Sequence, residues 1–113
     1  MNVIAKKLQS ITEKGDLTMA EIANVLGTRP ETVSRWNQGR AFPHPERERM
    51  LLELEWIVDQ LSDLYDPKEA RMWLISRQKL LDGRSPVDLI AESPESREKV
   101  LEAIRQLRDS IYV

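Results

Sequence analysis

The chain has 113 residues, no cysteine and a formal net charge of −2 at pH 7. This length is typical of one domain, or of two small lobes that share a core, and the absence of cysteine excludes disulfides and cysteine-held zinc. The content of 41% hydrophobic and 32% charged residues is typical of a folded protein. No apolar run approaches the roughly 18 residues that a membrane helix needs, and the first residues do not resemble a secretory signal, so we expect a cytoplasmic protein without membrane contact.

The charge of the chain is divided weakly between its two halves. Residues 1–46 carry six Lys or Arg against five Asp or Glu, and residues 47–113 carry eleven against fourteen, which gives net charges of +1 and −3. Neither half has the strongly basic balance of a protein that makes many phosphate contacts. We therefore expect any DNA binding to need a homodimer or a larger assembly.

The first predicted helix covers residues 3–14. Its apolar residues recur at helical spacing on one side, namely Val3, Ile4, Leu8 and Ile11. Gly15 and Asp16 are expected to end this helix. Thr18, followed three residues later by Glu21, forms a capping box that begins the next one.

The segment from Thr18 to Gly39 predicts two short helices joined by a tight turn. Gly27 lies where the first of them is expected to stop, and Pro30 lies where the second begins. In a helix-turn-helix, the first helix supports the second, which enters the DNA major groove. The spacing E-I-A-x-x-L-G-x-x-x-x-T-V-S-R-W resembles that of the Xre-type repressors, which implies a helix-turn-helix lobe over residues 1–42. A helical pair that binds no DNA is the alternative.

Five polar residues near the second of these helices are candidates for DNA contact. Arg35 is the best candidate to bind a guanine edge, and Glu31, one turn earlier, can accept from a cytosine amino group. The candidates for phosphate contact are Thr32, Arg29 and Arg40. Because Glu31 repels phosphate, the affinity of one copy is expected to be low. Each of these residues can also be a solvated surface residue without a partner.

Five of the six prolines stand where a helix is expected to begin, because proline is best tolerated at the first helical position. These are Pro30, Pro45, Pro67, Pro86 and Pro94. They predict, after a stiff connector at residues 39–45, a second lobe over residues 43–113 with a long helix at 45–65 and further helices near 67–76, 86–92 and 94–109. No strand pattern appears, so the predicted fold is all-α.

The long predicted helix carries an apolar stripe that is extensive for one small core. Its members are Met50, Leu51, Leu54, Ile57, Val58, Leu61, Leu64 and Tyr65. We expect the stripe to hold the second lobe together and, in part, to meet a second copy of the chain.

The sequence offers little that supports catalysis. The one histidine, His44, lies between two prolines, and the carboxylates alternate with Lys and Arg as on a solvated helix surface. There is no glycine-rich phosphate loop, no metal-ligand cluster and no nucleophile with a recognisable base. We expect a binding protein that is not an enzyme and that has no cofactor and no metal site.

Two motifs in the second lobe indicate a partner. The run A-R-x-W-L at residues 70–74, followed by L-L-D-G-R-S-P at residues 80–86, resembles the toxin-binding domain of the Xre/MbcA/ParS-type antitoxins of RES-Xre toxin–antitoxin systems. The resemblance implies an antitoxin that binds and inhibits a RES-domain toxin, an NAD-degrading enzyme, and that represses its own operon through operator DNA. Within these motifs, Trp73, Gly83 and Ser85 are expected to be mainly structural. The alternative is a simple dimeric helix-turn-helix repressor whose second lobe serves only for self-association.

The end of the sequence suggests how such a toxin is inhibited. Residues 110–113 are expected to leave the last helix, with Ile111, Tyr112 and Val113 plugging the toxin's cleft and the terminal carboxylate meeting the groups that hold NAD. A frayed terminus is the alternative. The further candidates for toxin contact are Arg84, Arg105 and Arg108.

Overall fold

The chain folds into seven α-helices and one short 3₁₀ helix over residues 2–112, which are the residues that the computed structural model describes; side chains are described for residues 2–111. The elements are α1 (Val3–Gly15), α2 (Met19–Val25), α3 (Pro30–Gln38), α4 (Pro45–Ser62), α5 (Pro67–Ile75), η1 (Lys79–Leu81), α6 (Pro86–Glu92) and α7 (Pro94–Tyr112). The described residues contain no strand and a single isolated β-bridge, between Gln78 and Arg84. The all-α prediction is confirmed, and no described helix has the length and apolarity to cross a membrane.

The helices begin where local chemistry favours a beginning. Each of the five predicted prolines is the first residue of its helix. Thr18 caps α2 and Asp66 caps α5, each within a complete capping box, and the Ser85 hydroxyl accepts a hydrogen bond from the Asp88 N–H at the start of α6. The helix starts are therefore fixed by short-range hydrogen bonds.

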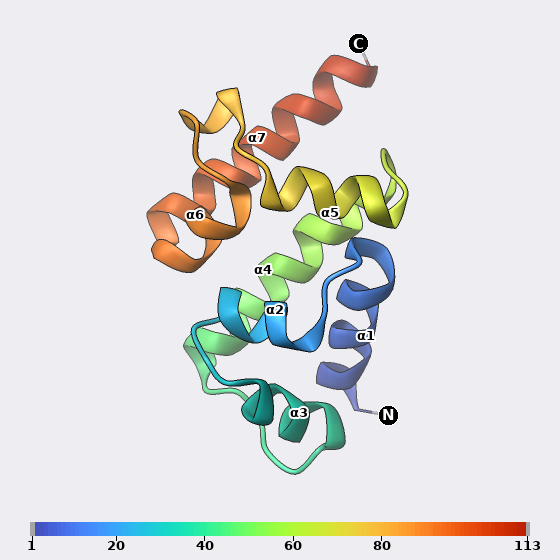
Figure 1. Ribbon diagram of the computed structural model, residues 1–113, viewed down its shortest axis with the longest axis vertical. Coiled ribbons are helices and arrows are strands. Elements are labelled where there is room, and N and C mark those ends of the chain that lie inside the picture. Colours follow the sequence, from blue (N-terminus) through green and yellow to red (C-terminus); the bar gives the residue numbers. More distant parts are fainter. Residues whose placement is uncertain (1, 113) are drawn as a thin grey trace.

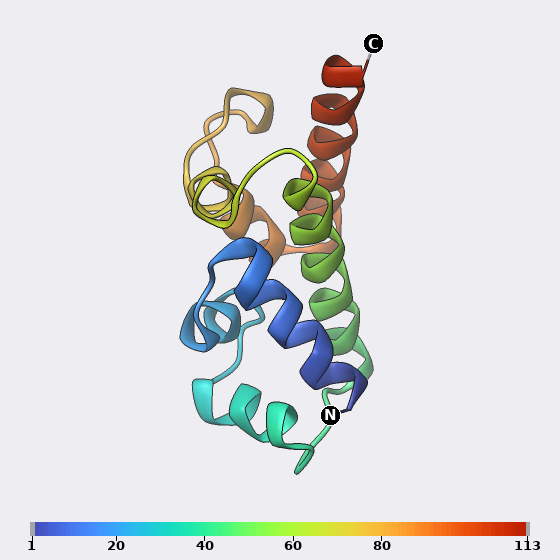
Figure 2. The same ribbon diagram turned by 90° about the vertical axis from the view of Figure 1, so that its right-hand side faces the viewer.

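Helix α4 lies along one side of the molecule beside α7, and α1 and α5 pack against it (Figures 1 and 2). A single core of buried apolar side chains joins the first three helices to the later ones. Its largest fully buried members are Leu8, Ile11, Ile22, Leu26, Val33, Leu51, Leu54, Ile57, Leu61, Leu74, Ile90 and Ile104. The division into lobes at residues 42 and 43 stays a prediction, since the core is continuous across it.

Three predicted helix ends were wrong. Helix α4 ends at Ser62 rather than at residue 65, because the N–H groups of Leu64 and Tyr65 both bond to the Leu61 carbonyl and the chain turns there. Helix α5 ends one residue early, at Ile75, since Ser76 is extended. Helix α7 runs to Tyr112 rather than to residue 109.

The expected apolar tail at residues 110–113 is therefore corrected. Nothing in the sequence breaks the helix at Ser110, whose hydroxyl donates to the Leu107 carbonyl at 2.9 Å, and the helical backbone continues through Tyr112. The side chain of Tyr112 and the whole of Val113 lie outside the described residues.

The apolar stripe on α4 is also used differently from the prediction. Its first six members, from Met50 to Leu61, are buried in this chain's own core, and Leu64 and Tyr65 are half-buried. The expectation that part of this stripe meets a second copy is therefore wrong for these six residues.

An ion pair joins α2 to α5 across the core. Arg71 Nη1 lies 2.6 Å from Glu21 Oε1 and also donates to the Asp16 carbonyl oxygen at 3.0 Å. Glu21 Oε1 also accepts from the Thr18 N–H at 3.0 Å. The Arg71 guanidinium, followed by the Thr18 backbone bond, lowers the pKa of Glu21 to about 2.

This ion pair predicts a pH-dependent difference between the wild type and Glu21→Gln. A lowered folded-state pKa means that the carboxylate stabilises the fold above its ordinary pKa and loses this effect as the pH falls toward 2. The wild type should exceed Glu21→Gln by about 1 kcal/mol in unfolding free energy at pH 7, a value reduced by solvent around a half-exposed pair. In urea titrations, this difference should close as the pH falls.

Arg71→Met provides the matched comparison. It should lose a similar amount at pH 7, and the double variant should lose little more than either single variant. A difference between the wild type and Glu21→Gln that stays constant from pH 7 to pH 3 would contradict the assignment.

Candidate functional site

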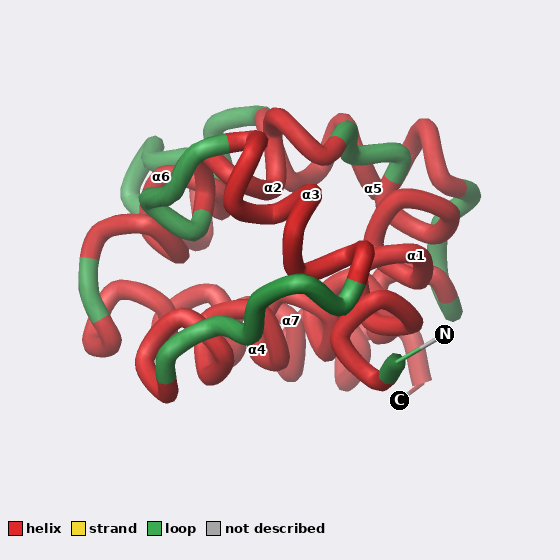
Figure 3. Tube along the Cα trace, turned by 90° about the horizontal axis from the view of Figure 1, so that it is seen from below, coloured by secondary structure: helices red, strands yellow, loops and turns green. Residues whose placement is uncertain are grey.

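Helices α2 and α3 are joined by a four-residue turn at one end of the molecule, which Figure 3 views from below. Gly27 has a φ of +67° in this turn, a conformation that favours glycine, and the Thr28 N–H closes the turn on the Ala23 carbonyl at 2.9 Å. Val33 and Trp36 of α3 are buried in the core. The opposite face of α3 is left to solvent.

The structure brings the predicted DNA-contact residues to this exposed end. Arg29, Glu31, Arg35 and Arg40 are exposed, whereas Thr32 is half-buried. None of the three arginines makes an ion pair with another described side chain. Three guanidinium groups at one end of the fold are therefore free to meet an anionic ligand.

The motif residues of the second lobe have the structural roles expected of them. Trp73 packs half-buried against the core, and its carbonyl accepts from Gln78 Nε2 at 2.9 Å. Gly83 has a φ of +80° in the loop after η1, and Ser85 is buried as the cap of α6. These residues shape the loop that precedes α6.

The structure does not bring together the three arginines predicted to contact a toxin. Arg84 pairs with Glu92 at 3.6 Å near α6, and Arg105 pairs with two glutamates of its own helix on the outer face of α7. Arg108 reaches α4, where Nη1 lies 3.0 Å from an Asp63 carboxylate oxygen. Each of the three is engaged within the chain, and Arg84 lies apart from Arg105 and Arg108, which are one turn apart on α7.

The last turn of α7 extends beyond the neighbouring helices at the end of the molecule opposite to α3 (Figure 1). Leu107 and Arg108 are its last half-buried residues, and the three residues that follow are exposed. The side chain of Ile111 is 52% exposed although it is apolar. The tip of α7 thus exposes an apolar side chain to solvent.

Sequence reasoning missed a buried arginine that anchors α7 to α4. Arg97 is 3% exposed, its Nε lies 2.7 Å from Glu53 Oε2, and its Nη1 donates to the Ile90 carbonyl at 3.0 Å. Its spacing of three and seven residues from Val100 and Ile104 places it on the apolar face of α7. That spacing was the available signal.

A second missed feature is an apolar groove between α4 and α7, which we call the α4/α7 groove. It encloses about 610 Å³ and is lined by Pro45, Glu48, Arg49, Leu52, Glu53, Trp56, Leu101 and Arg105. Leu52 and Trp56 are four residues apart and lie beside the buried stripe of α4 rather than on it. Their spacing was the signal that could have identified this face.

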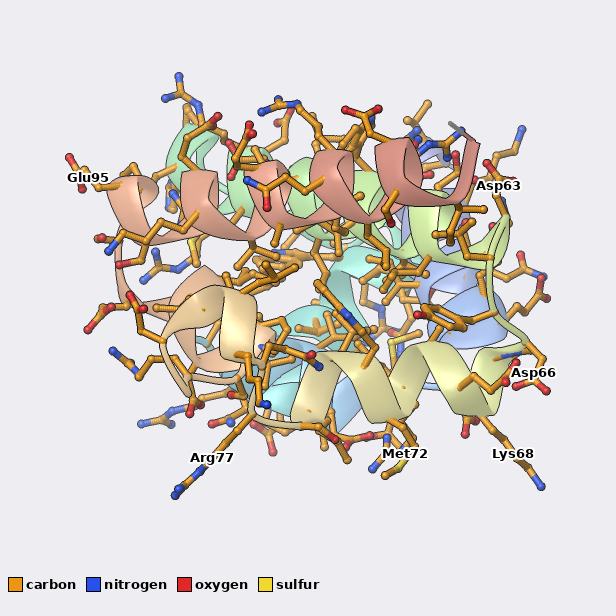
Figure 4. The ribbon with its side chains drawn as sticks, turned by 90° about the horizontal axis from the view of Figure 1, so that it is seen from above. Asp63, Asp66, Lys68, Met72, Arg77 and Glu95 are labelled. Carbon is orange, nitrogen blue, oxygen red and sulfur yellow. The ribbon has the colours of Figure 1, made fainter. Side chains whose placement is uncertain are left out.

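Further apolar side chains are exposed on and after α5, namely Met72, Ile75 and Leu80. Figure 4 shows Met72 pointing away from α7, together with Lys68 and Arg77. Among the described side chains, no three His, Cys, Asp or Glu residues gather in a way that could hold a metal ion, and His44 is exposed just before α4.

Comparison with known proteins gave full-length similarities, although no protein-family model matches the chain. The mycobacterial cidal antitoxin MbcA of Mycobacterium tuberculosis is 28% identical over 113 residues, which cover 100% of this chain and 98% of that protein, and MbcA of Mycobacterium bovis gives the same figures. A probable mycobacterial cidal antitoxin of M. tuberculosis is 34% identical over 97 residues, covering 86% of this chain and 81% of that protein. The fold is similar to a chain in the crystal structure of the M. tuberculosis MbcT-MbcA toxin-antitoxin complex, with a TM-score of 0.83, 27% identity and 100% coverage of both chains.

Proposed function

Because this chain belongs to the mycobacterial cidal antitoxin family, we propose that it binds a RES-domain, NAD-degrading toxin and inhibits it by occluding the active site. The resemblance found in the motifs of the second lobe is confirmed at the level of the family. Residues 43–113 supply the toxin contact in this proposal, and the end of α7 supplies the inhibiting group.

The observation that carries this proposal is the exposed tip of α7. Ile111 projects from a helix whose last fully buried residue, Ile104, lies two turns earlier and whose last half-buried apolar residue, Leu107, lies one turn earlier. Because the tip is already helical, little conformational entropy is lost when it enters a cleft. A pocket that binds nicotinamide must exclude water, so it accepts an apolar side chain of this kind.

The remaining contact surface lies outside the tip. Arg108 is held by Asp63 and Gln60 of α4, which fixes the direction in which α7 leaves the fold. The tip therefore acts as the inhibiting element in this proposal, while the rest of the second lobe supplies affinity. The two contributions can be separated by experiment.

Removal of residues 110–113 should release the toxin from inhibition without dissolving the complex. With purified toxin, the shortened antitoxin should copurify, yet NAD consumption should recover to at least half the rate of the free toxin. Ile111→Asp should have the same direction of effect, because a carboxylate is costly to place in an apolar pocket.

Ser110→Ala is the matched control, since this residue is exposed on the same turn and carries no apolar group. It should inhibit the toxin as well as the wild type does. Full inhibition by the shortened chain would contradict an active-site role for the tip. A chain that binds DNA and forms no toxin complex would instead be the simple dimeric repressor.

We also propose that α3 binds operator DNA and represses the antitoxin's own operon, with two copies of the chain acting together. Support comes from Arg29, Arg35 and Arg40, whose guanidinium groups have no acidic partner among the described residues. Arg35 lies one turn after Glu31 on the exposed face of α3, so it is placed to reach a guanine edge. Arg29 and Arg40 flank the helix and are placed to contact phosphates.

Arg35→Ala and Arg29→Ala should weaken DNA binding in different ways. Loss of a base contact should reduce operator affinity by about tenfold to a hundredfold and leave binding to unrelated DNA nearly unchanged. Loss of a phosphate contact should weaken binding to the operator and to unrelated DNA alike. It should also lower by about one the number of counterions released on binding, which the salt dependence of the affinity measures. Fluorescence anisotropy at several salt concentrations measures both effects.

Lys68→Ala removes the same charge from the exposed face of α5 and is the control. It should leave operator affinity unchanged. An operator affinity that is insensitive to Arg29→Ala, Arg35→Ala and Arg40→Ala alike would rule out α3 as the DNA-binding element.

A further inference from the structure

One side of the molecule is formed by α4 and α7 without any covering helix (Figure 2). The two helices run parallel there, because Glu53 of α4 pairs with Arg97 of α7 and, ten residues later, Asp63 pairs with Arg108. The α4/α7 groove runs along this uncovered side.

The floor of the groove is apolar. Leu52 is 39% exposed, and Trp56 and Leu101 are only partly covered by the core. Pro45, Leu52 and Trp56 follow one another at intervals of seven and four residues, so they lie along a single line on α4. A contiguous apolar line of this kind is costly to leave in water.

The two edges of this line carry unpaired charges of opposite sign, with Glu48 on the edge toward α1, called the acidic edge, and Arg49 on the edge toward α7, called the basic edge. On the edge toward α1, the helical spacing places Glu48, Glu55 and Asp59, the last two of which are paired with lysines of α1. On the edge toward α7 lie Arg49 and Arg105, of which Arg105 is paired with Glu98 and Glu102 of its own helix. Glu48 and Arg49 make no ion pair with any other described residue.

We propose that a second copy of this chain covers the α4/α7 groove in a two-fold dimer whose axis runs parallel to α4. Rotation about such an axis brings the acidic edge of each copy opposite the basic edge of the other. Glu48 of each copy then faces Arg49 of the other copy. Leu52 and Trp56 of one copy meet the same two residues of the other copy at the centre. An antiparallel two-fold would place acidic edge against acidic edge and is disfavoured.

The position of α3 favours the same arrangement. Helix α4 begins directly after the short connector from α3, and α3 lies at the N-terminal end of α4 (Figure 1). A two-fold axis parallel to α4 therefore holds both α3 helices at one end of the dimer. Operator binding by paired helices needs this arrangement, so the inference rests in part on the proposed DNA-binding function.

Reversing the charges of Glu48 and Arg49 tests the proposed dimer. Measured by sedimentation on the full chain without toxin or DNA, the wild type should form a dimer of twice the 13.1 kDa chain mass. Glu48→Arg and Arg49→Glu should each raise the dimer dissociation constant by about tenfold, since each places like charges opposite one another. The double variant Glu48→Arg/Arg49→Glu should recover the wild-type value, because the charges are again complementary.

Two further variants test the apolar floor. Leu52→Asp should give a monomer, whereas Met72→Asp, which changes another exposed apolar residue on the far side of the molecule, should leave the dimer intact. Circular dichroism checks that each variant keeps its helices.

Several outcomes would overturn the inference. These are a wild-type monomer at about 100 µM, a double charge variant as weak as its parents, and a Leu52→Asp variant that loses toxin binding while it keeps self-association. The last outcome would assign the groove to the toxin. Because toxin and DNA are absent from the sedimentation experiment, a failure of the proposed function leaves its result unaffected.

Discussion

The packing of α4 against α1 and α5 determines where every other surface of this protein lies. Its stripe from Met50 to Leu61 is buried, and this burial joins the helices before the connector to those after it in one core. The buried Arg97–Glu53 pair then holds α7 alongside α4. Replacement of Glu53 would weaken the contact of α7 with α4, because it would leave the buried Arg97 guanidinium without its carboxylate.

This arrangement separates two proposed activities in space. The molecule is 44 Å long, with α3 at one end and the last turn of α7 at the other (Figure 1). The residues proposed for toxin contact and for DNA contact are therefore different, and the uncovered side formed by α4 and α7 lies between them. Between these ends, the Glu21–Arg71 ion pair links α2 to α5.

Much of this fold was predictable because its signals are local. Pro67 with the Asp66 cap, for example, fixes the start of α5 through hydrogen bonds within four residues. Helix ends were predicted less well, since the turn after Ser62 depends on how Leu64 and Tyr65 meet the core. The features that place the candidate sites were missed, because the Arg97–Glu53 pair and the groove beside Leu52 join segments more than forty residues apart. Among the many charged residues of α7, only the spacing of Arg97 from Val100 and Ile104 marks it as a residue of the apolar face.

In the proposed function, one antitoxin copy engages its toxin with one end while the other end stays free for DNA. The most direct measurement adds the RES-domain toxin to the preformed complex of this protein with operator DNA and records the mass of the complex and the rate of NAD consumption together. The complex should gain the mass of the toxin, keep its DNA and consume no NAD. Stoichiometric release of DNA, or a bound toxin that still consumes NAD, would contradict the proposed function.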